Sequence, residues 1–93
     1  MPLEYLGVPP VASDRQARPF SPAVRAGDFI YVSGQVPADA QGEIVSGGIE
    51  AQTRQVMDNI KAALALAGAT LDDVCKCTCW LDDARDFGAF NRV

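Results

Sequence analysis

The sequence predicts one small domain that contains both β-strands and α-helices. In residues 22–33, two apolar runs flank Gly27-Asp28, a dipeptide that signals a hairpin turn. In residues 49–67 the apolar side chains recur at helical spacing, and in residues 74–81 they alternate with period two. A chain of 93 residues is long enough for a single domain.

The first third of the chain predicts strands. Residues 1–18 read as an irregular arm with one short strand around Glu4–Val8. Residues 29–33 are aromatic and β-branched, so they predict the second strand of the hairpin. Pro22 cannot donate a ladder hydrogen bond, which places it at an edge, a bulge or a strand start. The following loop contains two extended residues, Ile44-Val45.

The clearest helix covers residues 49–67, with Gly68 at the expected C-terminal cap. Its inner stripe is apolar and consists of Val56, Met57, Ile60, Ala63, Leu64 and Ala67. The strand predicted for residues 74–81 follows this helix, so we expect it to lie in the same sheet as an earlier strand. A second helix then begins with Asp83 as N-cap and carries Phe87 and Phe90 on one face.

This second helix is about ten residues long, which is marginal for an isolated helix. We therefore expect residues 1–93 to form a single domain that is incomplete at its C-terminus.

The three cysteines, Cys75, Cys77 and Cys79, alternate along the predicted strand. Residues i and i+4 of a strand are about 13 Å apart, too far for one zinc ion with ~2.3 Å bonds to sulfur. The parallel Cβ vectors of residues i and i+2 disfavour a disulfide, and no local base activates a thiol. Free cysteine is among the most buried residue types, so we expect reduced thiols packed under the helix, and no metal.

Composition excludes several classes of function. The net charge is −4 and the basic residues are scattered, which argues against nucleic acid as a partner. No run approaches the ~20 apolar residues of a membrane span. The odd cysteine count suggests reduced thiols in the cytoplasm. The chain has no histidine, so it lacks Ser-His and Cys-His catalysis. The carboxylate pairs Asp72-Asp73 and Asp82-Asp83 fit turns and caps.

Three quoted stretches, in this order, resemble the RidA (YjgF) family of reactive-intermediate deaminases. They are "RPFSPAV-x-AGDFIYVSGQVP", "QTRQVMDNIKAALALAGATLDDV" and "KCTCWLDDARDFGAFN". The resemblance extends from about Pro19 to Val93. It implies an α+β fold in which a mixed sheet carries two helices on one face, as in the chorismate-mutase-like fold. It also implies a homotrimer with ligand clefts between subunits.

The implied activity is cofactor-independent hydrolysis of 2-imino and enamine acids, such as 2-iminopropanoate and 2-iminobutanoate, to 2-keto acids and ammonia. Ser33 and Gly34 stand where the family has its cleft Ser-Gly, and Asn91 stands where it has its cleft asparagine. Phe20 replaces the usual tyrosine, so one hydroxyl is missing. The family's arginine and glutamate would lie beyond Val93, so we expect no catalytic residue within this chain.

Other functions remain open at this point. A non-catalytic trimer that binds a small carboxylate in the same cleft is favoured by Phe20. Ribonuclease activity, also claimed within the family, ranks low because the chain is acidic and lacks histidine. A trimeric scaffold for another protein is the fourth possibility. Asn91 could equally be a solvent-facing helix residue.

Overall fold

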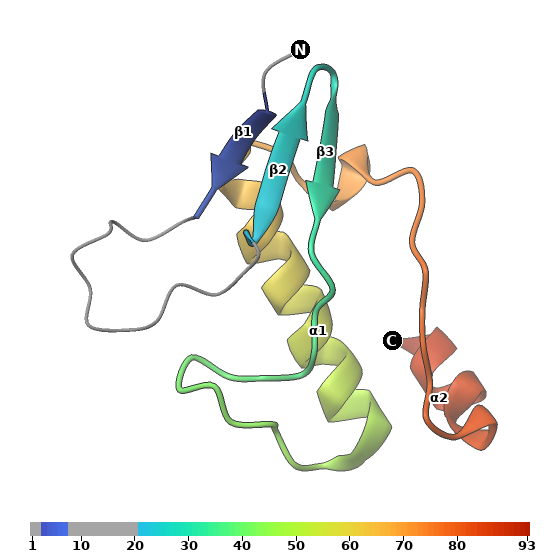
Figure 1. Ribbon diagram of the computed structural model, residues 1–93. Coiled ribbons are helices and arrows are strands. Elements are labelled where there is room, and N and C mark those ends of the chain that lie inside the picture. Colours follow the sequence, from blue (N-terminus) through green and yellow to red (C-terminus); the bar gives the residue numbers. More distant parts are fainter. Residues whose placement is uncertain (1–2, 8–20) are drawn as a thin grey trace.

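The structure is a computed structural model that describes residues 3–7 and 21–93. Three strands and two helices form an α+β fold, as the sequence predicts (Figure 1). The strands are β1 (Leu3–Leu6), β2 (Ala23–Ala26) and β3 (Phe29–Val32), and the helices are α1 (Gly48–Ala65) and α2 (Phe87–Arg92). Two short 3-10 helices, η1 (Leu71–Asp73) and η2 (Ala84–Asp86), precede and follow an extended stretch.

The predicted hairpin is confirmed, with β2 and β3 antiparallel and Ala26 opposite Phe29. Gly27 has φ 61°, and no residue other than glycine has positive φ in the described part of the chain. A positive φ at the first turn residue alone is typical of a type II′ turn, which matches the twist of the strands. Pro22 lies just before β2, where its carbonyl oxygen accepts the N–H of Ser33 at 3.1 Å.

Strand β1 pairs with β2, so the described strands form an antiparallel sheet of order β1-β2-β3. The predicted strand at residues 4–8 therefore exists but covers Leu3–Leu6. Most of the predicted arm lies outside the described residues. The extended pair at residues 44–45 is present only as an isolated bridge between Ala38 and Ile44.

Helix α1 covers one face of the sheet, crossing behind it in Figure 1. On that face Ala23 is fully buried, and Arg25 donates from Nη2 to the carbonyl oxygen of Ala67 at 2.9 Å. Of the predicted inner stripe of α1, Ala63 and Leu64 are buried, and Val56, Met57, Ile60 and Ala67 are half-buried.

The C-terminal end of α1 is closed by Gly68, as predicted. Gly68 has φ 73° and donates to Ala65, while the N–H of Ala69 reaches back to Leu64 at 2.9 Å. This pair of hydrogen bonds is a Schellman motif, which uses carbonyl groups that the helix leaves free.

The prediction for residues 74–81 is wrong in one respect. The segment follows an extended course in Figure 1, but no strand of the described residues pairs with it. The mixed sheet that a crossover would give is therefore not formed by these residues. The physical reason is that period-two spacing predicts an extended backbone, whereas a strand also needs a neighbour to receive its hydrogen bonds.

The prediction of buried cysteines is also wrong. All three thiols are free and exposed, because no element of the described chain covers this segment. Trp80 is 89% exposed in the same segment.

The predicted cap at Asp83 is present, but it belongs to η2, whereas α2 begins at Phe87 without a side-chain cap bond. The Asp83 carboxylate accepts the N–H of Arg85 at 2.9 Å and caps η2, which leads into α2. The rings of Phe87 and Phe90 are 6.5 Å apart, and Arg92 on α2 lies 3.8 Å from Glu50 on α1. Among residues 3–7 and 21–93, no helix is both long enough and apolar enough to cross a membrane.

Candidate functional site

The end of β3 holds the first predicted site residue, Ser33. Its N–H bonds to the carbonyl oxygen of Pro22, and its hydroxyl donates to the carbonyl oxygen of Ser21. Both partners belong to the chain entering β2, so the hairpin fixes Ser33 through its backbone and its side chain. The hydroxyl oxygen keeps its lone pairs to accept a hydrogen bond from a ligand or a water molecule.

Gly34 follows Ser33 and is exposed. Its φ is not positive, and a Cβ added to it would meet no atom within 4 Å among the described residues. Neither backbone conformation nor packing therefore requires a glycine here. A residue without a side chain at this place leaves room for a ligand to approach the backbone.

The chain beyond Gly34 is tied to α1 by Asn59. The side-chain amide of Asn59 donates to the carbonyl oxygens of Val36 and Ala38 at 3.1 and 3.0 Å. The side-chain oxygen of Asn59 accepts a hydrogen bond from the amide of Gln55 at 2.9 Å. These bonds fix both sides of the Ser33-Gly34 corner, because the hairpin holds one end and the helix holds the other.

Asn91 lies on α2 and is exposed, and no hydrogen bond of the described residues uses its side chain. In Figure 1, α2 lies below the level of the sheet, beside the N-terminal half of α1. No hydrogen bond or ion pair among the described residues joins the Ser33-Gly34 corner to α2, so the chain does not bring Asn91 to this corner by a direct contact. Phe20 falls outside the described residues.

Three arginines of the described residues already have partners. Arg25 bonds to Ala67 and lies 3.4 Å from Glu4, and Arg85 lies 2.8 Å from Asp83. Arg92 pairs with Glu50.

The perturbed pKa values of the described residues belong to a cap and not to this corner. The side chain and backbone N–H of Arg85 lower the pKa of Asp83, and the Asp83 carboxylate raises the pKa of Arg85. Arg85 is exposed and Asp83 is half-buried at the start of η2. Within the described chain, no three metal-ligating side chains converge.

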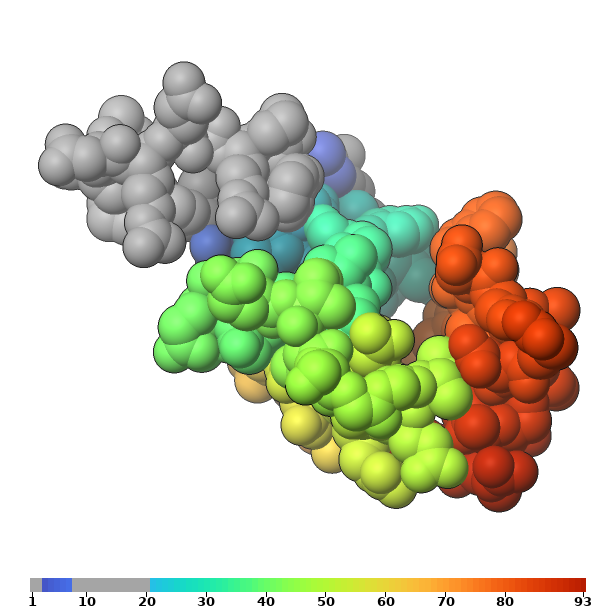
Figure 2. Space-filling view, turned by 90° about the horizontal axis from the view of Figure 1, so that it is seen from below, coloured from blue at the N-terminus to red at the C-terminus, as the bar shows by residue number. Residues whose placement is uncertain are grey.

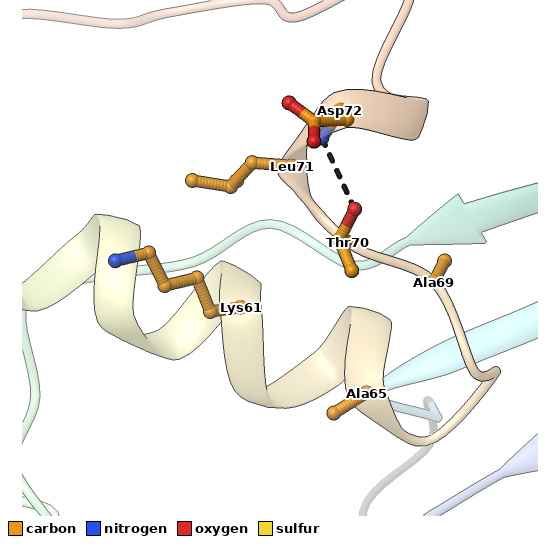
Figure 3. A pocket seen from close by; sticks show the side chains of 6 residues that line it. All are labelled: Lys61, Ala65, Ala69, Thr70, Leu71 and Asp72. Carbon is orange, nitrogen blue, oxygen red and sulfur yellow. Dashed lines mark hydrogen bonds between the residues drawn. The ribbon is translucent and has the colours of Figure 1, made fainter.

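A surface hollow of about 390 Å³ lies elsewhere, between the end of α1 and η1 (Figure 3). It is lined by Lys61, Ala65, Ala69, Thr70, Leu71 and Asp72. Beside it, the Thr70 hydroxyl accepts the N–H of Asp72, and the Asp73 carboxylate accepts the N–H of Thr70. The cap role predicted for Asp72-Asp73 is thus confirmed for Asp73, and the hollow contains none of the predicted site residues.

Sequence reasoning missed Ser21 and Asn59, which hold the corner. A usable signal existed for Ser21. A two-residue turn at Gly27-Asp28 places Pro22 opposite Ser33, so Ser21 must lie beside the Ser33 side chain. No comparable signal existed for Asn59, because its contacts bring together residues more than twenty positions apart.

Comparison with known proteins shows which family the chain matches. The pattern of the family described as Endoribonuclease L-PSP matches residues 12–93. A RutC family protein of Pyrococcus horikoshii is 51% identical over 76 residues, which are 81% of this chain and 60% of that protein. The mitochondrial protein MMF1 of Saccharomyces cerevisiae is 36% identical over 85 residues, covering 91% of this chain and 55% of the relative.

Solved structures agree with these matches. The crystal structure of yeast Mmf1 superposes with a TM-score of 0.84 at 32% identity, over 98% of this chain and 71% of that one. RidA from an Antarctic Psychrobacter species gives a TM-score of 0.70 at 32% identity, over 91% and 69% of the two chains. The chain spans about 60% of the length of the archaeal relative. On the combined evidence of sequence and fold, it belongs to the Endoribonuclease L-PSP family, the family of the RidA and RutC proteins.

Proposed function

We propose that this protein hydrolyses reactive 2-imino and enamine acids, such as 2-iminopropanoate and 2-iminobutanoate, to 2-keto acids and ammonia. The observation that supports this best is the Ser33-Gly34 corner. It combines a hydroxyl fixed by the hairpin with an exposed glycine that neither packing nor backbone conformation requires.

The chemistry needs positioning more than strong catalytic groups. Water adds to the imine carbon, the nitrogen gains a proton, and ammonia leaves as the carbonyl forms. A fixed acceptor such as the Ser33 hydroxyl oxygen can orient the water, and an amide such as Asn91 can bind the substrate. No cofactor takes part in this scheme.

The carboxylate anchor is the missing component. We propose that it is an arginine from chain beyond Val93, since Arg25, Arg85 and Arg92 are engaged elsewhere. The length of the relatives supports this, because the matched residues make up only 60% of the Pyrococcus protein. On this view residues 1–93 are one incomplete domain.

We also propose that the protein forms a homotrimer with its ligand clefts between subunits. The sheet face opposite α1 supports self-association. Leu3 aligns with Phe29 and Tyr5 aligns with Tyr31 across the sheet, and all four side chains are more than half exposed. An apolar sheet face of this kind is typical of an interface.

A cytoplasmic location is proposed from the odd number of free thiols.

The test uses two proteins, the 93-residue chain and an extended chain. In the extended chain, residues 1–93 are followed by the segment that comes after the matched region in the Pyrococcus relative. The imine is generated in situ from serine or threonine by a dehydratase, and its decay is followed. We expect the extended chain to accelerate the decay and the 93-residue chain to have no effect. Equal rates for the two would contradict the arginine argument.

Phe20→Tyr in the extended chain restores the family's hydroxyl. One positioning hydrogen bond is worth about 0.5 to 1.5 kcal/mol, so we expect a rate about two- to tenfold higher.

Phe20 also favours a second function. Without the tyrosine hydroxyl at position 20, the cleft could bind a small 2-keto carboxylate without turning over an imine. If the extended chain and its Phe20→Tyr variant are both inert but bind 2-ketobutyrate, the binding trimer replaces the deaminase. Ribonuclease activity is tested in parallel with a labelled RNA, and we expect no cleavage because the chain has no histidine.

A further inference from the structure

The register of the hairpin shows which side chains share a face with Ser33. Ala23 is fully buried on the face that α1 covers, and it pairs with Val32. Because side chains alternate along a strand, Tyr31 and Ser33 belong to the opposite face. The exposures agree, since Tyr31 is 62% exposed and Val32 is half-buried. Tyr31 is therefore the aromatic neighbour of Ser33 on the open face of the sheet.

The two residues are close enough to contact one ligand. Positions two apart on a strand are about 6.6 Å from each other, a distance that the length of a tyrosine side chain spans. The hydroxyl of Tyr31 can thus reach a small molecule that lies over the Ser33-Gly34 corner. Figure 2 shows the molecule from below, and the orange and red C-terminal residues leave the teal and green chain around the end of β3 uncovered.

The corner needs a side-chain donor, because its own donors are engaged. The Ser33 hydroxyl donates to the carbonyl oxygen of Ser21, and the Gln35 amide donates to the carbonyl oxygen of Ser33 at 3.1 Å. The Tyr31 hydroxyl, in contrast, takes part in no hydrogen bond among residues 3–7 and 21–93. A phenol can both donate and accept, so Tyr31 offers the hydroxyl proton that Ser33 cannot.

The ligand class offers a matching acceptor. A 2-imino acid has a lone pair on its imine nitrogen, and the 2-keto product has lone pairs on the keto oxygen at the same place. A hydrogen bond donated to this atom draws electron density away from the carbon that water attacks. The carboxylate of the ligand remains free for a separate anchor.

We infer that Tyr31 is a substrate-binding residue whose hydroxyl donates a hydrogen bond to the imine nitrogen of the substrate and to the keto oxygen of the product. This inference rests on the proposed function and adds a residue to its site. The hydroxyl keeps its proton, so Tyr31 binds and polarises the ligand without transferring a proton.

Tyr5 provides a matched control. It aligns with Tyr31 through Val24 on the same face and is 61% exposed. It lies two strand spacings away, about 10 Å from Tyr31. Tyr31→Phe and Tyr5→Phe each remove one hydroxyl and keep the ring. Sedimentation velocity should therefore give the parent's assembly state for both variants.

Titration calorimetry on the extended chain tests the inference with two ligands. They are 2-ketobutyrate and butyrate, which has the same chain and carboxylate but no keto oxygen. Tyr31→Phe should weaken 2-ketobutyrate binding about two- to tenfold, the effect of one hydrogen bond, and leave butyrate binding unchanged. Tyr5→Phe should change neither affinity.

Three results would overturn the inference. They are parent-like binding of 2-ketobutyrate by Tyr31→Phe, an equal loss of both ligands, and the same loss in Tyr5→Phe. The proposed function is judged separately, by imine decay. A chain that binds 2-ketobutyrate through Tyr31 but leaves the imine intact supports the inference and contradicts the deaminase. An active deaminase that Tyr31→Phe leaves unchanged in rate and in binding shows the reverse.

Discussion

At the scale of single residues, the corner at the end of β3 depends on one side-chain hydrogen bond. We predict that Ser33→Ala lowers the free energy of unfolding by about 0.5 to 1.5 kcal/mol, because the hydroxyl no longer bonds to Ser21. Ser46→Ala is the matched control, since Ser46 is exposed in a loop. Urea denaturation of both variants measures the difference. Equal stabilities for the two variants would show that the Ser33 bond contributes nothing.

We predict opposite effects on stability for alanine substitutions at two glycines. At Gly7, φ is 73° and an added Cβ would lie 2.7 Å from Leu66 and 2.9 Å from Pro22. Gly7→Ala should therefore destabilise the fold by at least about 1 kcal/mol. Gly34→Ala should leave thermal stability unchanged, because its Cβ would meet no atom of the described residues. It should weaken ligand binding in the extended chain, because the same Cβ would take up space that the ligand needs. A large loss of stability from Gly34→Ala would mean that this glycine serves the fold and not a ligand.

At the scale of elements, one surface ion pair, between Asp83 and Arg85, caps the η2 turn that precedes α2. Arg85 lowers the pKa of Asp83, so we predict that Arg85→Ala raises it toward the ordinary value of about 3.9. Because the folded pKa is the lower one, the stabilisation of this turn is present above the ordinary pKa. It is lost as the pH falls through the lowered value. NMR titration of the Asp83 carboxyl carbon measures the shift, with Arg92→Ala as control. A midpoint that Arg85→Ala leaves in place would contradict the assignment.

Elements defined by local signals could be predicted from the sequence. The hairpin follows from Gly27-Asp28 between two apolar runs, and α1 follows from its stripe and Gly68. Residues 74–81 could not be predicted fully, since alternation fixes an extended backbone but not the neighbour that makes it a strand. For the same reason the burial of the cysteines was predicted wrongly: burial depends on what covers the segment.

The candidate site was predictable in identity but not in geometry. Ser33, Gly34 and Asn91 were named from a family resemblance, which carries no distances. The hairpin register could have supplied the Ser21 contact of Ser33, because it is set by the turn. The distance between this corner and Asn91 depends on how sheet and helices assemble, and no local pattern encodes that.

At the scale of the whole molecule, the sheet face opposite α1 should control assembly. We predict that Tyr31→Glu in the extended chain converts a trimer into monomers, because three copies of the charge would meet in an apolar interface. Arg54→Glu changes charge on the exposed side of α1 and should leave the trimer intact. Sedimentation velocity at micromolar concentration distinguishes the two. A monomeric parent protein would contradict the predicted interface.

The central claim is that the Ser33-Gly34 corner binds a small 2-keto or 2-imino carboxylate. The most direct measurement is an NMR titration of the extended chain with 2-ketobutyrate, the stable product of the proposed reaction. We predict saturable shifts of the Ser33 and Gly34 amides and of the Asn91 side-chain amide. Shifts centred on the hollow of Lys61 and Asp72, or none at any concentration up to the millimolar range, would contradict the claim.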